Sequence, residues 1–559
     1  MSRASRFWTA MVVLIGVLAF VQVRSIRLET QTFDEGFDLA AGYSYWKTGD
    51  FRINREHPPL GKLINALPLL VLNPSLPLDH PSWAQEDNVV FGEQFLYFNR
   101  VPADTLLFAG RMMSILTTLI AAFCFALWMR RRFGDTAALI GLTFLCFDPN
   151  LIAHGRYVTS DIFVAVFFFF ASVTWVRYLE APSWKMLILA GALTGCALTS
   201  KVSALYLLPV FFVLYLLRPG RFSFWHMVGS MAGLVGTAVL VVIAVYAPEV
   251  DRLAPATHRY LRGHRQTRMI HEVIERKSPL SEVLVFAGRK LKVQNHSFLV
   301  ACNMVAVHNA TGHPAYVLGK VTQHGAWYYF PVAFAVKTPT AVLLALLGLL
   351  AVGVRRRRPP ILWIALVMIP AGYFAFSMAG NINIGLRHIL PVYLFLYAML
   401  GAVMASWRKW VVGALLVLLM AESLAIHPHY LAFFNWVSGG PGNGPRYLVD
   451  SNIDWGQDVV KLRDWMAEQK IPRVYLHYFG RTDLTTYGLP FDWLPRSADG
   501  KEWDDVDGYA AVSVTPLMGV YTPWEELRRV RERPLVAKVG YSIYVFDMRK
   551  ARGSTERTK

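Results

Sequence analysis

Long apolar runs separated by short polar connections dominate the chain. A helix that crosses a bilayer needs about 20 mostly apolar residues, and roughly 17 to 25 are tolerated. The predicted spans cover residues 7–24, 105–128, 136–151, 161–178, 185–200, 202–217, 224–246, 328–353, 360–378, 388–405 and 410–427. Because this gives about 11 spans, the pattern predicts a mainly α-helical, polytopic membrane protein. No small-residue cleavage site follows the first run, so we expect it to be retained rather than removed as a signal peptide.

Positive charges predict how these spans are oriented. Lys and Arg residues gather on alternate connections, and short basic loops stay on the cytoplasmic side of a membrane. The basic connections contain Arg130, Arg131 and Arg132, then Arg177 and Lys185, Arg218 and Arg221, Arg355 to Arg358, and Arg408 with Lys409. With an odd number of spans, we expect a cytoplasmic amino terminus and an extracytoplasmic carboxyl terminus.

On this orientation the long polar segments face the extracytoplasmic side. A first outer loop, residues 25–104, and a large outer loop, residues 247–327, interrupt a membrane domain that covers residues 1–427. Residues 428–559 then leave the last span through a Gly/Pro-rich stretch, which is typical of a connection between packed units. We therefore predict a membrane domain followed by a smaller extracytoplasmic domain.

Residues 428–559 carry the periodicities of a small α/β fold. Ser451, Asn452 and Asp454 are residue types that cap helices, and the apolar spacing after them predicts a helix to about Lys470. Alternating apolar positions predict strands at residues 474–479, 509–514 and 541–546. The order of these elements favours an α/β domain.

Composition agrees with a chain that lies mostly in lipid. The 559 residues are 54% hydrophobic and carry a net charge of +18. Since the Lys and Arg residues lie between apolar runs, loop orientation explains this charge better than nucleic-acid binding does. The 4 cysteines form no CxxC pair, so neither a disulfide framework nor a zinc motif is predicted.

The first outer loop holds the most informative acidic residues. Thr32, Asp34 and Glu35 open an amphipathic stretch that ends near Gly49, which predicts a helix lying along the membrane surface. Glu35 has two equally good interpretations, a capping box with Thr32 or a catalytic group. Asp34 lies at the edge of the bilayer, where an ionisable group is costly and is usually retained for function. A carboxylate there, Asp34 or Asp38 one turn later, is placed to accept a proton from a hydroxyl.

Other polar residues near the predicted outer membrane surface have both structural and functional interpretations. His57 and Lys62 flank a Pro-Pro helix start and serve equally well as interface anchors. Asp161 is favoured at a helix amino terminus for electrostatic reasons alone, although its intramembrane setting favours a functional role. The remaining cations suit either snorkelling or an anionic lipid head group, and they are Lys201, Lys337, Arg387 and His388.

Histidines are frequent in the large outer loop but do not form a metal motif. They are His258, His264, His271, His296, His308, His313 and His324. No pair has the spacing of a known metal site, and a solvated loop explains them better. We predict no metal and no cofactor.

Several of these residues together resemble a known enzyme family. The relevant segments are Asp34-Glu35, His57-Pro58-Pro59-Leu60-Gly61-Lys62, Arg111, and Arg156-Tyr157-Val158-Thr159-Ser160-Asp161. In this order and on one side of the membrane, they resemble the protein O-mannosyltransferases and their bacterial relatives, glycosyltransferase family 39 of the C-type superfamily. The similarity covers roughly the first 220 residues. Later segments look like bacterial members of the family, and these are residues 328–339, 383–388 and 450–458.

The resemblance implies a reaction and assigns residues to it. A polyprenyl-phosphate-linked sugar would be the donor, and a hydroxyl of a glycan, lipid or protein would displace the phosphate with inversion. Asp34 would be the general base, with Glu35 beside it in acceptor or sugar binding. The implied substrate-binding residues are His57, Lys62, Arg111, Arg156, Asp161, Lys201 and Arg387, with Arg111 on the donor phosphate. A β-trefoil domain, which eukaryotic members carry in an outer loop, is not evident.

The implied location is the plasma or inner membrane, with the chemistry on the extracytoplasmic face. The alternative is a non-catalytic transporter or flippase of lipid-linked sugars, for which inverted repeats and broken helices near the bilayer midplane would be typical. The ionisable residues instead lie toward one face, which favours an enzyme.

Overall fold

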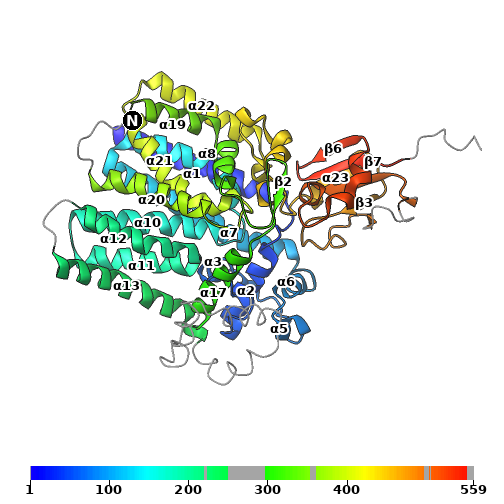
Figure 1. Cartoon of the computed structure of the whole chain (residues 1–559), viewed down its shortest axis with the longest axis horizontal. Coiled ribbons are helices and arrows are strands. Elements are labelled where there is room, and N and C mark those ends of the chain that lie inside the picture. Colours follow the sequence, from blue (N-terminus) through cyan, green and yellow to red (C-terminus); the bar gives the residue numbers. More distant parts are fainter. Residues whose placement is uncertain are drawn as a thin grey trace, which may run out of the picture.

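The computed structural model of the chain describes residues 2–218, 223–249, 296–352, 360–495, 503 and 505–549. Apolar helices lie side by side in a bundle, and a small sheet lies at one end of it (Figure 1). This confirms the prediction of a mainly helical membrane protein that carries an α/β region near its carboxyl terminus.

Six helices in the described ranges are long and apolar enough to cross a membrane. They are α1 (Arg3–Ile26), α7 (Ala103–Phe133), α10 (Asp161–Glu180), α13 (Phe224–Tyr246), α20 (Ile361–Met378) and the 3-10 helix η3 (Leu386–Ile389) continued by α21 (Leu390–Met404). The shorter apolar helices are α8 (Asp135–Phe147), α11 (Trp184–Ser200), η1 (Val202–Tyr206) with α12 (Leu207–Leu217), and α22 (Lys409–Ala425). Every predicted span is therefore helical, while the number that crosses the membrane stays a prediction.

The span predicted at residues 328–353 is broken in two. Helices α18 (Tyr329–Lys337) and α19 (Thr340–Val352) meet at an angle of 108° around Pro339. Proline lacks an N–H and disfavours helical geometry in the residue before it. The Asn435 side-chain amide donates to the carbonyls of Ala335 and Thr338, at 2.7 and 2.8 Å, and so satisfies groups that the break leaves without helical partners.

Small residues allow close packing between helices α11 (Trp184–Ser200) and α13 (Phe224–Tyr246). Helix α11 packs against both α10 and α13, and α8 packs against α7 and α21. Gly191 and Gly195 lie on the α13 side of α11, where an added Cβ on either would come within 2.6 Å of a side chain of α13. Glycines four residues apart allow two membrane helices to approach closely, which explains the α11–α13 contact.

The outer-loop helices gather at the end of the bundle that carries the C-terminal sheet (Figure 1). They are α2 (Glu35–Thr48), α3 (Leu60–Asn65), α4 (Leu69–Leu72), α5 (Pro81–Gln85), α6 (Asn88–Tyr97), α9 (Pro149–His154) and α17 (His296–Thr311). As predicted, α2 ends at Gly49, whose φ of 66° is the left-handed conformation of a helix stop. Residues 38–45 of α2 are buried, and the helix packs against α3 and α6, while its position relative to the membrane surface stays a prediction.

Among the described residues, two basic connections and the amino terminus meet at the opposite end. The Arg130 guanidinium lies 4.3 Å from the ring centre of Phe7 in α1, and Arg132 pairs with Glu180 at 2.5 Å. The amino terminus and the ends of α7 and α10 therefore lie together, as the alternating charge pattern predicts. Which end faces the cytoplasm stays a prediction.

A mixed five-stranded sheet forms the core of the C-terminal region. Its strand order is β4-β3-β5-β7-β6, with β3 parallel to β4 and β5, and β7 antiparallel to β5 and β6. The strands are β3 (Val474–His477), β4 (Phe491–Trp493), β5 (Tyr509–Ser513), β6 (Leu535–Val539) and β7 (Ile543–Asp547). Three of them lie where strands were predicted. Helix α23 (Val459–Glu468) begins after Asp458, later than predicted, because residues 450–458 form a turn.

Short elements complete the fold. They are η2 (Ala247–Glu249), β1 (Ala315–Val317), β2 (Lys320–Thr322), η4 (Tyr430–Ala432), η5 (Trp436–Ser438), η6 (Pro441–Arg446), η7 (Asp450–Asn452), α24 (Val514–Leu517), η9 (Trp524–Leu527) and α25 (Arg528–Arg531). Strands β1 and β2 pair in a hairpin, and Val317 of this hairpin also pairs with Leu448. The large outer loop is thereby joined to the C-terminal region.

Candidate active site

Four of the predicted residues form one chain of ion pairs at the sheet end of the bundle. An Arg387 terminal nitrogen, Nη1, lies 2.9 Å from Asp34 Oδ2 and 3.6 Å from Asp161 Oδ2. The Lys201 ammonium lies 2.6 Å from the other oxygen of Asp161. Charges therefore alternate from Asp34 through Arg387 and Asp161 to Lys201, and the fold brings them together from four distant segments.

Regular helix ends position two members of this ion-pair chain. Asp161 is the first residue of α10, and Lys201 is the residue that follows α11. Because α10 and α11 are consecutive helices packed against each other, the start of one lies beside the end of the other. The helix terminus that favours a negative charge at Asp161 thus also faces the cation.

Arg387 is held from the C-terminal side of the site. Its guanidinium carbon lies 4.2 Å from the ring centre of Trp455, a cation–π contact. One residue earlier, the Leu386 N–H donates to the side-chain oxygen of Asn452 at 3.0 Å. Residues of the 450–458 turn therefore fix both the backbone and the side chain of this cation.

Asp34 is the more accessible of the two carboxylates in the ion-pair chain. Its side chain is 20% exposed, whereas that of Asp161 is 1% exposed. The backbone before Asp34 is fixed, because the N–H groups of Thr30 and Phe33 donate to the carbonyls of Gln457 and Trp455 at 3.0 and 2.8 Å. Asp34 precedes α2 but makes no side-chain capping bond. Its carboxylate is therefore free for a proton acceptor role, apart from its bond to Arg387.

Glu35 and Arg111 form a separate, fully buried pair. The Glu35 oxygens accept from Arg111 at 2.6 and 2.8 Å, from the Thr32 N–H at 2.8 Å and from the Val158 N–H at 3.0 Å. Arg111 uses its other N–H groups on the carbonyls of Ile26, Glu29 and Thr30. With every donor of Arg111 occupied, this geometry does not support the predicted contact with a donor phosphate. Both residues instead position the loop that carries Asp34.

Arg156 also lies apart from Asp34. It donates to Glu29 Oε1 and to the Tyr157 hydroxyl, each at 3.0 Å, and it is completely buried. The Tyr157 hydroxyl in turn donates to Glu29 at 3.0 Å. This pairing ties the loop before α10 to the end of α1, which makes Arg156 a positioning residue rather than a visible substrate contact.

His57 and Lys62 lie close to the ion-pair chain but differ in accessibility. The ammonium of Lys62 is buried and donates to the Asn54 carbonyl at 2.6 Å, while the Asn54 amide donates to Asp38 at 2.6 Å. Burial raises the pKa of Asp38 and lowers the pKa of Lys62, although each charge partly offsets the shift of the other. Burial, with the nearby positive charges of Lys201 and Lys62, lowers the pKa of His57 to about 4. His57 is therefore a neutral imidazole beside the charged site.

Lys337 does not join the group of cations at the site. Its buried ammonium donates to the carbonyls of Leu431 and Asn452. It supports the turn that holds Arg387, and its ammonium is bonded within the protein. The expectation that it would bind an anionic head group is thus not supported.

A second group of polar residues near the site was not predicted together. The Glu56 carboxylate lies 2.6 Å from His308 Nδ1, and His308 Nε2 lies 2.9 Å from His313 Nδ1. His313 Nε2 lies 2.8 Å from the Tyr521 hydroxyl, which donates to Asp450 Oδ2 at 2.8 Å. The only signal in the sequence is the density of histidines in the large outer loop and of acidic residues at 450–458.

Metal-binding geometry does not appear in this group. Within residues 2–218, 223–249, 296–352, 360–495, 503 and 505–549, no three His, Cys, Asp or Glu side chains are arranged to hold a metal ion. The predicted loop histidines His258, His264 and His271 lie outside the described residues.

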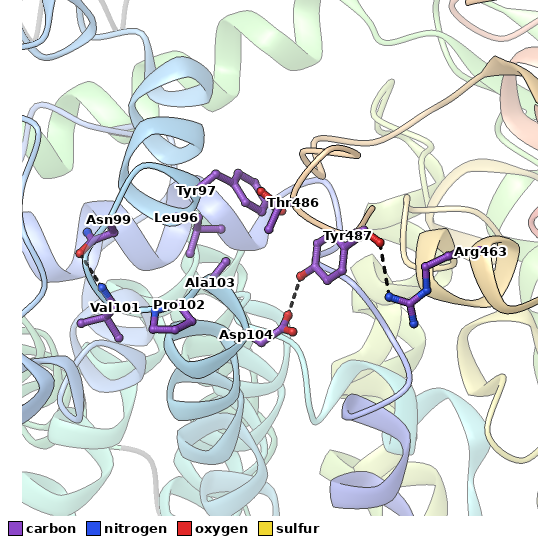
Figure 2. Close-up of a pocket in the computed structure, with 10 residues that line it drawn as sticks. All are labelled: Leu96, Tyr97, Asn99, Val101, Pro102, Ala103, Asp104, Arg463, Thr486 and Tyr487. Carbon is purple, nitrogen blue, oxygen red and sulfur yellow. Dashed lines mark hydrogen bonds between the residues drawn. The ribbon is translucent and has the colours of Figure 1, made fainter. Parts of the chain in front are cut away.

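A cavity of about 370 Å³ lies between the segment that leads into α7 and the C-terminal region (Figure 2). At its edge the Tyr487 hydroxyl donates to Asp104 at 2.5 Å, and Arg463 donates to the Tyr487 carbonyl at 3.3 Å. None of the predicted site residues lines it. The cavity is thus separate from the ion-pair chain at Asp34.

Part of the chain matches a known protein family. Residues 100–247 match the family model described as dolichyl-phosphate-mannose-protein mannosyltransferase. This confirms the resemblance predicted from the sequence, within a segment that contains Arg111, Arg156, Asp161 and Lys201. No curated protein sequence matches the chain significantly.

Several solved structures are similar to the chain at low sequence identity. ArnT from Cupriavidus metallidurans bound to undecaprenyl phosphate is 13% identical, with a TM-score of 0.49, and 97% of this chain and 98% of that chain are covered. The Archaeoglobus fulgidus oligosaccharyltransferase with Zn and sulfate is 12% identical, with a TM-score of 0.40 and coverage of 92% and 71%. The S. cerevisiae Pmt1-Pmt2 complex bound to the sugar donor is 15% identical, with a TM-score of 0.33 and coverage of 45% and 34%.

Proposed function

We propose that this chain is a membrane glycosyltransferase that moves a sugar from a polyprenyl phosphate to an acceptor hydroxyl on the extracytoplasmic face. The observation that carries the proposal is the ion-pair chain of Asp34, Arg387, Asp161 and Lys201 at one end of an apolar helix bundle. A partly exposed carboxylate next to two cations suits a reaction that removes a proton and releases a phosphate. The matched family description, which names a lipid-phosphate sugar donor, supports the same chemistry.

Asp34 is the general base in this proposal. The acceptor oxygen forms a bond to the anomeric carbon as the bond from that carbon to the phosphate oxygen breaks. The acceptor proton passes to the Asp34 carboxylate, and direct displacement inverts the anomeric configuration. Asp161 is too deeply buried for this step, and it instead holds Arg387 and Lys201 in place.

Arg387 and Lys201 would bind the phosphate and stabilise the charge that it gains on leaving. Together with the two carboxylates they form a group with no net charge, so an incoming anion competes with Asp34 for Arg387. We expect binding of the donor to draw Arg387 toward the phosphate, which would leave the Asp34 carboxylate free to accept the acceptor proton. His57 lies close enough to contact the same substrate, whereas Glu35, Lys62, Arg111 and Arg156 position the loops around it.

Replacing Asp34 with Asn tests the base. The full chain in proteoliposomes is given dolichyl-phosphate mannose or undecaprenyl-phosphate-linked sugars with a cell-envelope extract as acceptor. We expect Asp34→Asn to lower sugar transfer by about 10²- to 10⁴-fold, because general base catalysis contributes that much, while binding of polyprenyl phosphate is kept. Asp50→Asn, in the same outer loop and paired only with Arg52 at the surface, is the matched control.

Two results would remove this proposal. Sugar transfer at most of the wild-type rate by Asp34→Asn would exclude the base role. Movement of the lipid-linked sugar across the bilayer without loss of any glycosidic linkage would support a flippase instead.

A further inference from the structure

A continuous hydrogen-bonded chain links the neighbourhood of Asp34 to the outer surface. It runs from Asp450 through Tyr521, His313 and His308 to Glu56, with successive distances of 2.8, 2.8, 2.9 and 2.6 Å. These residues come from the first outer loop, the large outer loop and the C-terminal region. We call this group the His-Tyr chain. Each of its residues can both give and take a proton.

The two ends of the His-Tyr chain lie in different surroundings. Asp450 is buried, and the charges of Arg387 and Asp34 both act on it, so it adjoins the proposed active site. At the other end, the side chains of Glu56 and His308 are 28% and 26% exposed. Tyr521, between the two ends, is 47% exposed. A proton that enters at Asp450 would therefore pass from the site to groups that meet solvent, at Tyr521 and at His308.

Donor and acceptor roles in the His-Tyr chain follow from its chemistry. Burial raises the pKa of Glu56, but the bond from His308 and the nearby His57, His308 and His313 together lower it to about 2. The same bond raises the pKa of His308. Burial and the charge of His308 lower the pKa of His313 to about 4. An imidazolium His308 then donates to Glu56 and to a neutral His313. His313 donates to the oxygen of Tyr521, which donates to Asp450.

The same number of protons also fits a second arrangement. A proton on Asp450 is donated to the Tyr521 oxygen, the Tyr521 proton moves to His313 Nε2, and the His313 Nδ1 proton moves to His308 Nε2. Asp450 gives one proton, Tyr521 and His313 each give one and receive one, and His308 receives one, so only the position of the excess proton changes. Chains of this kind shift protons without large motions of heavy atoms.

We infer that the His-Tyr chain carries the proton released by the acceptor hydroxyl from the active site to the extracytoplasmic solvent. This inference rests on the proposed function. After sugar transfer the proton sits on Asp34, and it passes through the hydroxyl or water in the site to Asp450. His308 releases its Nδ1 proton to solvent through Glu56. The two imidazoles then exchange tautomers and the Tyr521 hydroxyl rotates, which empties His308 Nε2, and the next shift through Tyr521 and His313 returns a proton to it. One proton enters and one leaves in each cycle, and Asp34 is restored as a base.

Tyr521→Phe interrupts the His-Tyr chain with little change in packing. The ring of Tyr521 stacks on Phe479 with centres 5.4 Å apart, and phenylalanine keeps this contact while it lacks the hydroxyl. We expect a fall of about tenfold or more in kcat, within the range that proton transfer contributes, without a change in the binding of undecaprenyl phosphate. The control is Tyr475→Phe, whose hydroxyl donates to the Asp505 carbonyl outside the His-Tyr chain.

His313→Ala provides a readout that a purely structural role would not affect. Added imidazole should restore much of the transfer rate of His313→Ala, because the free base can carry the proton that the side chain carried. The wild-type rate should fall in heavy water by a smaller factor than that of the variant, in which proton removal limits turnover. The exposed His324, changed to Ala, is the matched control for both measurements.

The outcomes separate this inference from the proposed function. If the wild type transfers sugar, Asp34→Asn does not, and Tyr521→Phe and His313→Ala turn over at wild-type rates or fail to respond to imidazole, the relay is wrong and the base stands. If Asp34→Asn keeps its activity, Asp34 does not take up the acceptor proton, and both the base role and the proton relay are wrong. If the variants transfer sugar slowly and added imidazole restores the rate of His313→Ala, the result supports both the relay and the proposed function.

Discussion

At the scale of single residues, Glu35 and Arg111 form a buried ion pair that holds the loop carrying Asp34 in position. Removing one partner of a buried ion pair leaves the other uncompensated, at a cost of about 3–5 kcal/mol. We therefore expect Arg111→Ala to lower the stability of the purified protein by about that much, measured as a fall in its melting temperature. For the solvent-accessible pair of Arg132 and Glu180, we expect Arg132→Ala to lower the free energy of unfolding by at most about 1 kcal/mol. Equal effects of the two variants would contradict this role for Arg111.

Asp454 predicts a dependence of stability on pH. It is completely buried, and burial raises its pKa from 3.8 to about 8, although the Thr515 N–H donates to it at 3.0 Å. Between these two pH values the folded protein holds a proton that the unfolded chain has lost, so stability falls as the pH rises through this range. The free energy of unfolding falls by about 1.4 kcal/mol per pH unit at most.

Asp454→Asn cannot titrate and should remove this dependence. We expect the melting temperature of the wild type, relative to Asp454→Asn, to be lower at pH 8 than at pH 5. The exposed Asp464, changed to Asn, should give no such difference. A constant difference between wild type and Asp454→Asn across this range would show that Asp454 is charged in the folded protein.

At the scale of elements, the turn at residues 450–458 organises the site. The Asn452 side chain accepts from the Leu386 N–H at 3.0 Å and donates to the Tyr329 hydroxyl at 2.9 Å. Loss of a buried hydrogen-bond partner costs about 1–3 kcal/mol. We expect Asn452→Ala to displace the segment that carries Arg387 and to lower kcat/KM for sugar transfer about tenfold.

Asn443→Ala is the control for this element. Its side chain lies in the same C-terminal region but donates only to the nearby Gly439 carbonyl. We expect wild-type kcat/KM for this variant. Similar losses in Asn443→Ala and Asn452→Ala would point to general loosening of the region rather than to the placement of Arg387.

The helices were the most predictable elements, because a long apolar run has few alternatives in lipid. The break at Pro339 was visible as a proline but was not predicted, since it depends on Asn435, which lies far along the chain and satisfies the freed carbonyls. Strands β4 and β6 were also missed. Both are short or largely exposed, so they lack the alternation that identified β3, β5 and β7.

The candidate site was predictable as a set of residues but not as a set of contacts. Asp34, Asp161, Lys201 and Arg387 were each predicted from their setting at the membrane edge together with the family resemblance. Their order in the ion-pair chain depends on packing between distant helices, which local pattern cannot give. The same limit applies to Arg111, whose bond to Glu35 spans 76 positions of sequence, while its phosphate role stays a prediction.

At the scale of the whole molecule, orientation in the membrane is the prediction that matters most for function. In a variant without the native cysteines, Asp79→Cys in the first outer loop and Ser183→Cys in a basic connection are both at exposed positions. We expect an impermeant maleimide to label position 79 but not position 183 in intact spheroplasts. The reverse pattern would place the ion-pair chain on the cytoplasmic side and would exclude an extracytoplasmic reaction.

The bonds between the segment before Asp34 and the 455–457 turn also bear on how the protein is made. Thr30 donates to the Gly456 carbonyl across 426 positions of sequence. A ribosome that adds about 5–20 residues per second needs roughly 20–85 s to supply that partner after Thr30 has emerged. The loop at Asp34 therefore cannot form its bonds to the 455–457 turn until translation is nearly complete. Chains that stop early would thus reach the membrane without a working centre.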